Sequence, residues 1–129
     1  MNSTQNKITS FTDLYAWQEA HSLVIKIYEV SALFPKNQQF SLVSQMQRAA
    51  VSITSNIAEG FSRKTNKEKY QFYSISQGSL TELQNQLLIA RDLHYLRKDV
   101  FNLLANQTIS VSKLLNGLKR SLSKLTTSR

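Results

Sequence analysis

The stretch "VFNLLANQTISVSKLLNGLKRSLSKL", residues 100–125, has the most regular apolar pattern in the chain. Its positions recur at alternating spacings of three and four residues, eight times in succession. They are Phe101, Leu104, Thr108, Val111, Leu115, Leu118, Leu122 and Leu125. This spacing places all eight side chains on one face of an α-helix, as in the contact seam of a helical bundle. The stretch therefore predicts a long helix that packs against other helices, and we expect Asp99 to cap it.

Three segments upstream of this stretch show the same helical spacing of apolar residues. Pro35 ends the first of them, because proline cannot continue a helix. The residues expected to cap the three helices are Thr12 or Asp13, then Ser41, then Thr65 with Glu68 as a capping box. With the final stretch included, the predicted helices span about residues 13–33, 41–62, 66–95 and 99–125.

The short connections between these segments make neighbouring helices antiparallel. The sequence thus predicts an all-α fold, an up-down-up-down antiparallel four-helix bundle that forms a single domain over residues 11–129. Residues 1–10 are polar, and we expect them to form a loose N-terminal segment. The chain of 129 residues has three glycines and one proline, too few for the turns of a β-sandwich or barrel.

Composition also excludes several classes of protein. The chain has no cysteine, which excludes disulfides and thiolate metal sites. It has no run of about 18 apolar residues that could span a membrane. Residues 1–10 lack the apolar core of a signal peptide. We therefore expect a soluble cytoplasmic protein.

Positive charge is in excess and is unevenly distributed. Sixteen Lys and Arg against eight Asp and Glu give a net charge of +8, and residues 100–129 contain five cations and no acid. In an up-down-up-down bundle, the turn between the second and third helices lies at the same end as both termini. This topology gathers nine cations at one end: Lys7, Arg63, Lys64, Lys67, Lys69, Lys119, Arg120, Lys124 and Arg129. They predict a surface for polyanions, although a solvated face and the macrodipole preference for cations at helix C-termini would also place charge there.

The stretch "SNIAEGFSRKT", residues 55–65, sets Glu59 and Gly60 directly before four of these cations. It could hold a catalytic carboxylate beside a phosphate-binding glycine, or it could be a packing device. A lone glycine beside Arg and Lys does not bind phosphate without a strand-loop-helix context. We favour packing, with Gly60 at a close contact or at the end of the helix.

The expected register of the second and third helices supports that preference. A turn centred near residue 64 places Gly78 opposite Ala49 and Ala50, where small residues allow close packing. It also places Arg48 opposite Ser79, with Glu82 one turn away. Since charges that leave water need partners, we expect a polar layer that fixes the register. Its expected members are Arg48, Ser52, Ser55 and Glu59 on the second helix, and Ser79, Glu82 and Gln86 on the third.

The sequence offers little support for an enzyme. The acid–histidine neighbours, Glu19 with His21 and Asp92 with His94, are two residues apart and so point to different sides of a helix. Neither a GxSxG motif nor a P-loop occurs. His21 lies on an apolar stripe and is expected to be a hydrogen-bonded core or interface residue. A hydrolase built on Glu59 and Glu82 is the weakest alternative, so we expect no catalytic residues, metal or cofactor.

Four elements of the chain also match a known family: Leu14 to Trp17, Phe34-Pro35, "SLVSQMQRAAVSITSNIAEG" and "GSLTELQNQL". Over residues 11 to about 93, the chain resembles the four-helix-bundle proteins encoded within 23S rRNA intervening sequences. It is also similar to the accessory variability determinant of diversity-generating retroelements. The recurring positions of the family, carried over to this sequence, are Arg48, Ser52, Asn56, Glu59, Gly60, Gly78, Ser79 and Glu82. On this ground Asn56 joins the expected polar layer.

The resemblance implies a ring-shaped homopentamer. It further implies a basic assembly that binds a reverse transcriptase and nucleic acid. The residues agree with an oligomer, because more apolar positions occur than one seam requires. These surplus residues are Ile25, Ile27, Leu103, Ile109 and Leu114. Either another subunit covers them or they fill a thicker core.

The leading hypothesis is a non-enzymatic, homo-oligomeric nucleic-acid-binding accessory protein, associated with rRNA or partner to a reverse transcriptase. No base-reading motif is visible in the sequence, so phosphate contacts should dominate the binding. The alternative is a pure assembly scaffold, or protein-interaction module, whose charge serves solubility or a protein partner.

Overall fold

The computed structural model describes the backbone of residues 7–127 and the side chains of residues 7–122. Four α-helices account for most of this range: α1 (Tyr15–Ser31), α2 (Leu42–Ser62), α3 (Asn66–Asp92) and α4 (Lys98–Thr127). Short 3-10 helices precede α1 (η2, Phe11–Asp13) and α2 (η3, Lys36–Gln38). The predicted all-α, four-helix fold is confirmed, and each predicted helix boundary lies within three residues of the observed one. Within residues 7–127, no helix has the length and apolar character that crossing a membrane requires.

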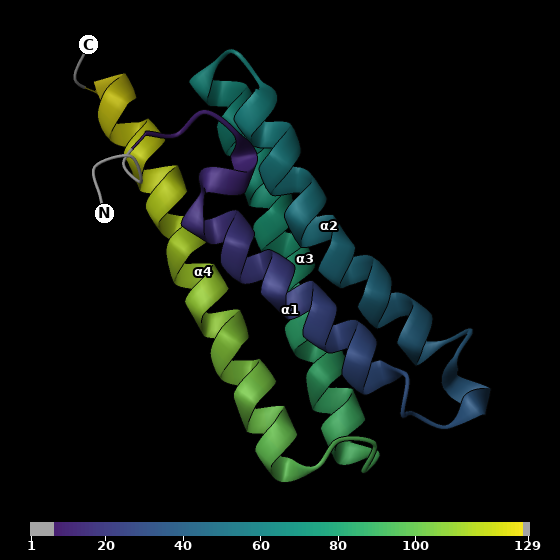
Figure 1. Ribbon diagram of the computed structural model, residues 1–129. Coiled ribbons are helices and arrows are strands. Elements are labelled where there is room, and N and C mark those ends of the chain that lie inside the picture. The colour runs from purple at the N-terminus through teal and green to yellow at the C-terminus, as the bar shows by residue number, and fades with distance from the viewer. Residues whose placement is uncertain (1–6, 128–129) are drawn as a thin grey trace.

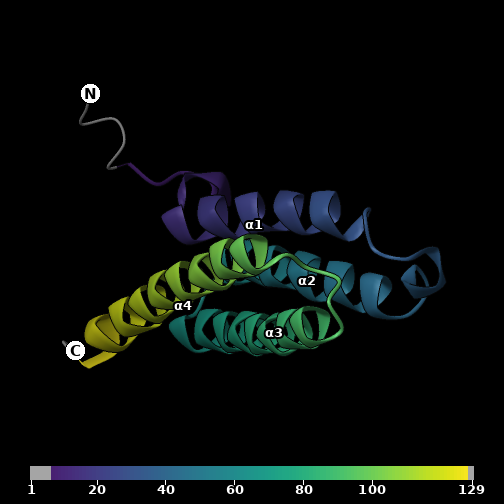
Figure 2. The ribbon, with the colours of Figure 1, turned by 90° about the horizontal axis from the view of Figure 1, so that it is seen from below.

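The helices pack as an up-down-up-down bundle (Figure 1). Each helix contacts its neighbours in the chain, α4 closes the ring against α1, and the α2–α3 pair has the most extensive contact. Figure 2 shows α1 and α3 along opposite edges, with α2 and α4 between them. The turn between α2 and α3 lies at the same end of the bundle as the C-terminal end of α4, and the other two connections lie at the opposite end (Figure 1).

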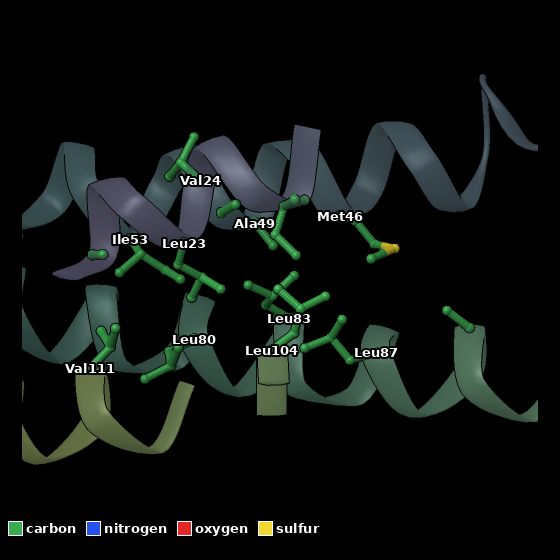
Figure 3. Close-up of a cluster of buried hydrophobic side chains, with 14 of the residues drawn as sticks. Leu23, Val24, Met46, Ala49, Ile53, Leu80, Leu83, Leu87, Leu104 and Val111 are labelled. Atoms are coloured by element: carbon green, nitrogen blue, oxygen red, sulfur yellow. The ribbon is translucent and has the colours of Figure 1, made fainter. Parts of the chain in front are cut away.

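One apolar core runs through the bundle and contains most of the predicted seam of α4. Figure 3 shows Leu23, Ile53, Leu83 and Leu104 from the four helices converging on it. On α4, Leu104, Thr108, Val111 and Leu115 are buried, and Phe101, Leu118 and Leu122 pack against the core partly exposed. Burial of each large aliphatic side chain contributes about 1.5–3 kcal/mol. The side chain of Leu125 lies outside the described side chains.

Thr108 is the one polar member of this seam, and its hydroxyl is fully hydrogen-bonded. It donates to the carbonyl oxygen of Ala105 at 2.7 Å and accepts from the side-chain amide of Gln84 at 3.1 Å. Gln77 of α3 donates in the same way to the hydroxyl of Ser112 at 2.8 Å. A buried hydroxyl that is paired loses little on leaving water. These two bonds therefore join α3 to α4 at defined positions.

The helix N-termini agree with the predictions only in part. Ser10, not Thr12 or Asp13, is the capping residue, and it caps η2, while α1 begins after Leu14 without a side-chain cap. The Asp13 carboxylate accepts the N–H groups of Thr9 and Ser10, both at 3.0 Å. These bonds hold the pKa of Asp13 below its usual value. Asp13 therefore stabilises the turn that precedes α1 and does not cap α1 itself.

The predicted caps of the other three helices also agree only in part. Thr65 caps α3 as predicted, accepting the N–H of Glu68 at 3.1 Å, but the Glu68 carboxylate accepts the Thr65 hydroxyl and not a backbone N–H. Ser41 occupies the N-cap position of α2 without making a side-chain cap. Asp99 lies inside the first turn of α4 and not at its cap. Its bonds to Arg97 and to the N–H of Val100 lower its pKa.

The register between α2 and α3 differs from the predicted one. The hydroxyls of Ser52 and Ser79 face each other at 2.7 Å, so Ser79 meets Ser52 and not Arg48. Ser76, fully buried, donates to the carbonyl oxygen of Ile53 at 2.8 Å. Hydroxyls thus set the pairing of these helices at two successive turns. With this register, Gly78 no longer faces Ala49 and Ala50.

The two glycines of this helix pair have opposite environments. A Cβ atom at Gly60 would lie 2.7 Å from a ring carbon of Tyr73 and 3.1 Å from the Cβ of Phe72. Gly60 is therefore the close contact that the sequence predicted. Gly78 is exposed, and a Cβ atom there would meet nothing within 4 Å. The prediction of close packing at Gly78 is wrong, because the observed register turns this residue to solvent.

Alanine at these two positions should have opposite effects on stability. Gly60→Ala should lower the free energy of unfolding, since overpacking costs about 1–3 kcal/mol against a helix-propensity gain of up to about 1 kcal/mol. Tyr73 is 3% exposed, so its ring lies among closely packed neighbours. Gly78→Ala should raise stability by about 0.5–1 kcal/mol. Thermal and urea unfolding measure the change in stability of each variant. An increase in stability on Gly60→Ala would contradict the observed contact.

Candidate nucleic-acid interface

The basic end of the bundle brings the start of α3 together with the last turns of α4. The ammonium nitrogen of Lys119 lies over the ring of Tyr70, 5.1 Å from its centroid. Tyr70, Asn116, Lys119 and Arg120 border a hollow of about 210 Å³. The turn between α2 and α3, with Arg63 and Lys64, and the start of α3, with Lys67 and Lys69, lie at this same end (Figure 1). The juxtaposition expected from topology is therefore present in the fold.

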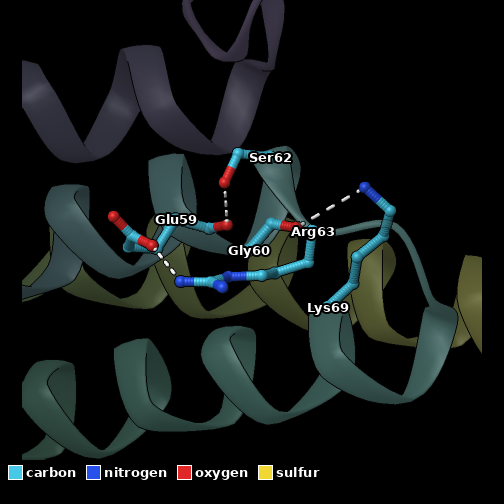
Figure 4. A network of polar contacts seen from close by, with 5 residues as sticks. All are labelled: Glu59, Gly60, Ser62, Arg63 and Lys69. Atoms are coloured by element: carbon cyan, nitrogen blue, oxygen red, sulfur yellow. Dashed lines mark hydrogen bonds and ion pairs between the residues drawn. The ribbon is translucent and has the colours of Figure 1, made fainter.

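Two of the nine predicted cations hold the end of α2, as Figure 4 shows. The Lys69 ammonium donates to the carbonyl oxygen of Phe61 at 2.7 Å and lies within 3.5 Å of that of Gly60. Arg63 forms an ion pair with Glu59 and stacks its guanidinium 4.6 Å above the ring of Phe72. Lys69 thereby caps the last carbonyls of α2, and both cations lie at the negative end of the macrodipole of this helix. Their first role is structural.

The remaining cations at this end are directed to solvent as far as the structure describes them. Lys7, Lys64, Lys67 and Arg120 are exposed and Lys119 is half-buried. None of these five makes an ion pair with a residue that the structure describes. The side chain of Lys124 and all of Arg129 lie outside the described residues.

Glu59 and Glu68 offset this charge only slightly. Glu59 is paired with Arg63, and its side chain is 52% exposed. The prediction that Glu59 lies inside the bundle is therefore wrong, because the side chain turns toward the next helical turn and keeps its contact with water. Glu68 accepts from Thr65 at the start of α3. The free cations therefore outnumber the free acids at the basic end.

The predicted polar layer is present in Ser52, Asn56 and Ser79. Ser52 and Ser79 bond across the interface, and the side-chain amide of Asn56 donates to the carbonyl oxygen and hydroxyl of Ser52 at 2.8 and 3.1 Å. Gln86 is buried, whereas Ser55 is exposed. The layer is a chain of small neutral groups that links α2 to α3. Such groups lose less on leaving water than charges do.

Like Glu59, the other two expected charged members, Arg48 and Glu82, do not belong to it. Both side chains are exposed, and no ion pair joins them within the described part of the chain. They border an open groove of about 490 Å³ between α2 and α3, with Ser52 and Gln86 on its walls. The register accounts for the difference, because it pairs Ser79 with Ser52 and leaves the two charges at the rim, in water.

Removal of Glu82 should therefore have little effect on stability. We expect Glu82→Ala to change the free energy of unfolding by about 0.5 kcal/mol or less, as for most surface substitutions. Ser79→Ala removes a buried partner of Ser52 and should cost about 1 kcal/mol or more. Urea unfolding of both variants provides the comparison. A loss for Glu82→Ala that exceeds the loss for Ser79→Ala would show that Arg48 and Glu82 form a stabilising pair after all.

His21 is exposed, so the prediction that it could lie in the core is wrong, whereas a place at an interface stays a prediction. Its ring stacks on Trp17, with the centroids 4.5 Å apart and the planes 16° from parallel. A position on the edge of the apolar stripe explains this, since one face of the ring covers indole while the residue as a whole stays exposed. Within residues 7–122, no three His, Asp or Glu side chains come together as a set of metal ligands.

The aromatic side chains of the basic end were not singled out by the sequence reasoning. Lys69 lies 5.4 Å from the ring centroid of Phe61, Arg63 lies over Phe72, and Lys119 lies over Tyr70. The sequence does contain a pattern that could have identified them, because these three aromatic residues flank the run of four cations between residues 63 and 69. Alternation of aromatic and basic residues is typical of surfaces that bind single-stranded nucleic acid.

Comparison with known proteins places the chain in a family. Residues 12–117 match the sequence pattern that defines the 23S rRNA-intervening sequence proteins. The chain belongs to this family. The match includes α1 to α3 and most of α4, so the predicted resemblance is confirmed and extends beyond residue 93. Lys119 and Arg120 lie just outside it.

A solved structure supports the fold of this intervening-sequence family protein. The solved structure is that of a protein with unknown function from the S23 ribosomal protein family, from Bacteroides thetaiotaomicron. It is 17% identical in sequence and superimposes with a TM-score of 0.76 over 81% of this chain and 95% of that one. At this identity, the likeness concerns the fold alone. A search of curated proteins found no match.

Proposed function

We propose that this member of the 23S rRNA-intervening sequence family is a non-enzymatic, homo-oligomeric accessory protein that binds the backbone of RNA or DNA. The observation that carries the proposal is the meeting of two basic segments at one end of the bundle. One is the turn between α2 and α3, and the other is the last part of α4, whose cation Lys119 reaches Tyr70 of α3. Residues 100–129 contain five cations and no acid, and all of these cations except Lys113 belong to the nine predicted for the basic end.

The solvent-directed cations are better explained by phosphate binding than by a role in stabilising the fold. Lys69 and Arg63 already neutralise the end of α2. The macrodipole of a helix needs only one or two charges in its last turn, so Lys64, Lys67 and Arg120 exceed that need. Like charges held close together repel, and a polyanion relieves the repulsion while its condensed counterions return to solution. Binding of this kind depends on charge density and only weakly on base sequence.

The family supports an RNA-linked setting, since its name ties it to intervening sequences of 23S rRNA. We propose that the protein acts in the cytoplasm, on rRNA or beside a nucleic-acid enzyme such as a reverse transcriptase. No part of this role requires chemistry from the bundle itself.

A salt titration tests the phosphate-binding role. Wild-type protein should bind RNA and duplex DNA at low salt, with an affinity that falls steeply as salt rises. A variant with Lys64, Lys67, Arg120 and Lys124 changed to Gln should lose affinity, and its salt slope should fall by up to about 0.9 for each phosphate contact removed. Fluorescence anisotropy at two salt concentrations measures both quantities.

The matched control changes Lys36, Arg48, Lys98 and Lys113 to Gln. It removes the same net charge away from the basic end and should retain most of the affinity. Equal binding by wild type and the first variant, or no binding by wild type at low salt, would replace this proposal with the pure assembly scaffold.

Exposed apolar side chains support the homo-oligomer. Of the surplus residues, Ile27 is fully buried in the core and Leu114 packs against it, but Ile25, Leu103 and Ile109 are exposed. Ile109 and Leu88, which are 48% and 42% exposed, border an apolar groove of about 160 Å³ between α3 and α4. Contiguous exposed apolar surface of this kind marks an interaction site. We propose that a second copy covers it, in a ring of five subunits that presents every basic end on one side.

Light scattering during size-exclusion chromatography gives the assembly mass. We expect a multiple of 14.7 kDa, and five subunits in the proposed ring. Ile109→Glu should dissociate the assembly, because it buries a charge at the apolar groove. Ser55→Glu, at an exposed position of α2, adds the same charge and should leave the mass unchanged. A stable wild-type monomer at micromolar concentration would refute the oligomer.

A further inference from the structure

The hollow at the basic end has features that phosphate binding alone does not require. Its walls are Tyr70 from α3 and Asn116, Lys119 and Arg120 from α4. Tyr70 is 43% exposed, and its hydroxyl makes no hydrogen bond with any residue that the structure describes. The neighbouring aromatic residues differ, since Tyr73 is buried and Phe72 is half-buried beneath Arg63. A partly exposed aromatic ring thus borders the hollow beside two cations and an amide.

Each wall of the hollow matches one part of a nucleotide. The ring of Tyr70 offers a flat apolar face to a base, and aromatic–base stacking is tolerant of sequence because every base has a π-face. The side-chain amide of Asn116 carries both donors and an acceptor for a base edge. Arg120 is exposed and can form paired hydrogen bonds with phosphate oxygens. Binding to phosphate alone would need only the cations.

Lys119 lies over the ring in the free protein, 5.1 Å from its centroid, but it need not block a base. The attraction of an exposed ammonium for an aromatic face is weak compared with its attraction for a phosphate. The flexible four-carbon stem of lysine lets the ammonium turn aside. A phosphate would therefore draw Lys119 off the ring and leave the face open to the base of the same strand.

A duplex cannot use this face, because its bases are stacked inside the double helix and only its phosphates and groove edges are accessible. A single strand, a loop or a bulge presents unstacked bases to aromatic side chains. We propose that the basic end binds single-stranded nucleic acid in preference to duplex, with Tyr70 as the platform for an unpaired base. This inference rests on the proposed nucleic-acid function and names its substrate class.

The test compares a single-stranded oligouridine with an RNA duplex of the same length, by fluorescence anisotropy at low salt. Wild type should bind the single strand more tightly. Tyr70→Leu keeps apolar bulk and removes the ring, so it should weaken single-strand binding by about 5- to 100-fold and change duplex binding by about 2-fold or less. Tyr70→Phe keeps the ring and should bind the single strand like wild type. Tyr15→Leu, at another exposed tyrosine, is the matched control and should change neither affinity.

The outcomes separate this inference from the proposed function. If wild type binds both nucleic acids and Tyr70→Leu changes neither affinity, the platform is refuted and phosphate binding stands. If Tyr70→Leu weakens both equally, Tyr70 supports the shape of the basic end and does not stack on a base, which also overturns the inference. If wild type binds neither the single strand nor the duplex at low salt, the proposed function and this inference are both overturned. Circular dichroism establishes that each variant retains the helical content of wild type.

Discussion

The close packing of Gly60 against the ring of Tyr73 is the contact on which the basic end depends. With no side chain at Gly60, α2 reaches α3 near the turn that joins them, and Tyr73 enters the core. The same approach brings the last carbonyls of α2 within reach of Lys69 and sets Arg63 over Phe72. A larger side chain at residue 60 would push the helices apart at the point where the cations gather. Packing of the core and the arrangement of the surface charge are therefore coupled at one residue.

The cations of this end serve two different purposes. Lys69 and Arg63 complete the C-terminus of α2, where carbonyl groups and the macrodipole attract positive charge. Lys64, Lys67 and Arg120 have no such partner among the described residues and remain in water. Like charge in the second group opposes the folded state slightly, and a bound polyanion would remove that opposition. A surface that gains stability from its ligand in this way is suited to binding rather than to structure.

Neutral hydroxyls, and not ion pairs, fix the alignment of α2 with α3. The Ser52–Ser79 bond and the Ser76 bond to the carbonyl of Ile53 satisfy buried groups at low desolvation cost. A buried pair of Arg48 and Glu82 would have required two charges to leave water, which the Coulomb attraction often fails to offset. Because these two side chains lie at the rim of the groove, the interface is neutral at its centre and charged only at its edge. This division explains why residues on adjacent helical turns have such different environments.

The sequence by itself determined the helices, their order and the end of the bundle at which charge collects. Those features depend on local periodicity, on Pro35 and Thr65 as boundary residues, and on the antiparallel course that short connections impose. The buried position of Gly60 was also within reach of the sequence. The sequence did not show which of the remaining motif residues enter the α2–α3 interface. Gly78, Arg48 and Glu82 all lie outside it. Only the tertiary structure decided this, since the register and the rotation of each helix about its axis decide which side chains face the neighbour, and successive residues lie about 100° apart around a helix. That register is set by the summed packing of all four helices. The same packing brings Tyr70 to Lys119, and because these residues lie far apart in the chain, no local sequence pattern indicates their contact.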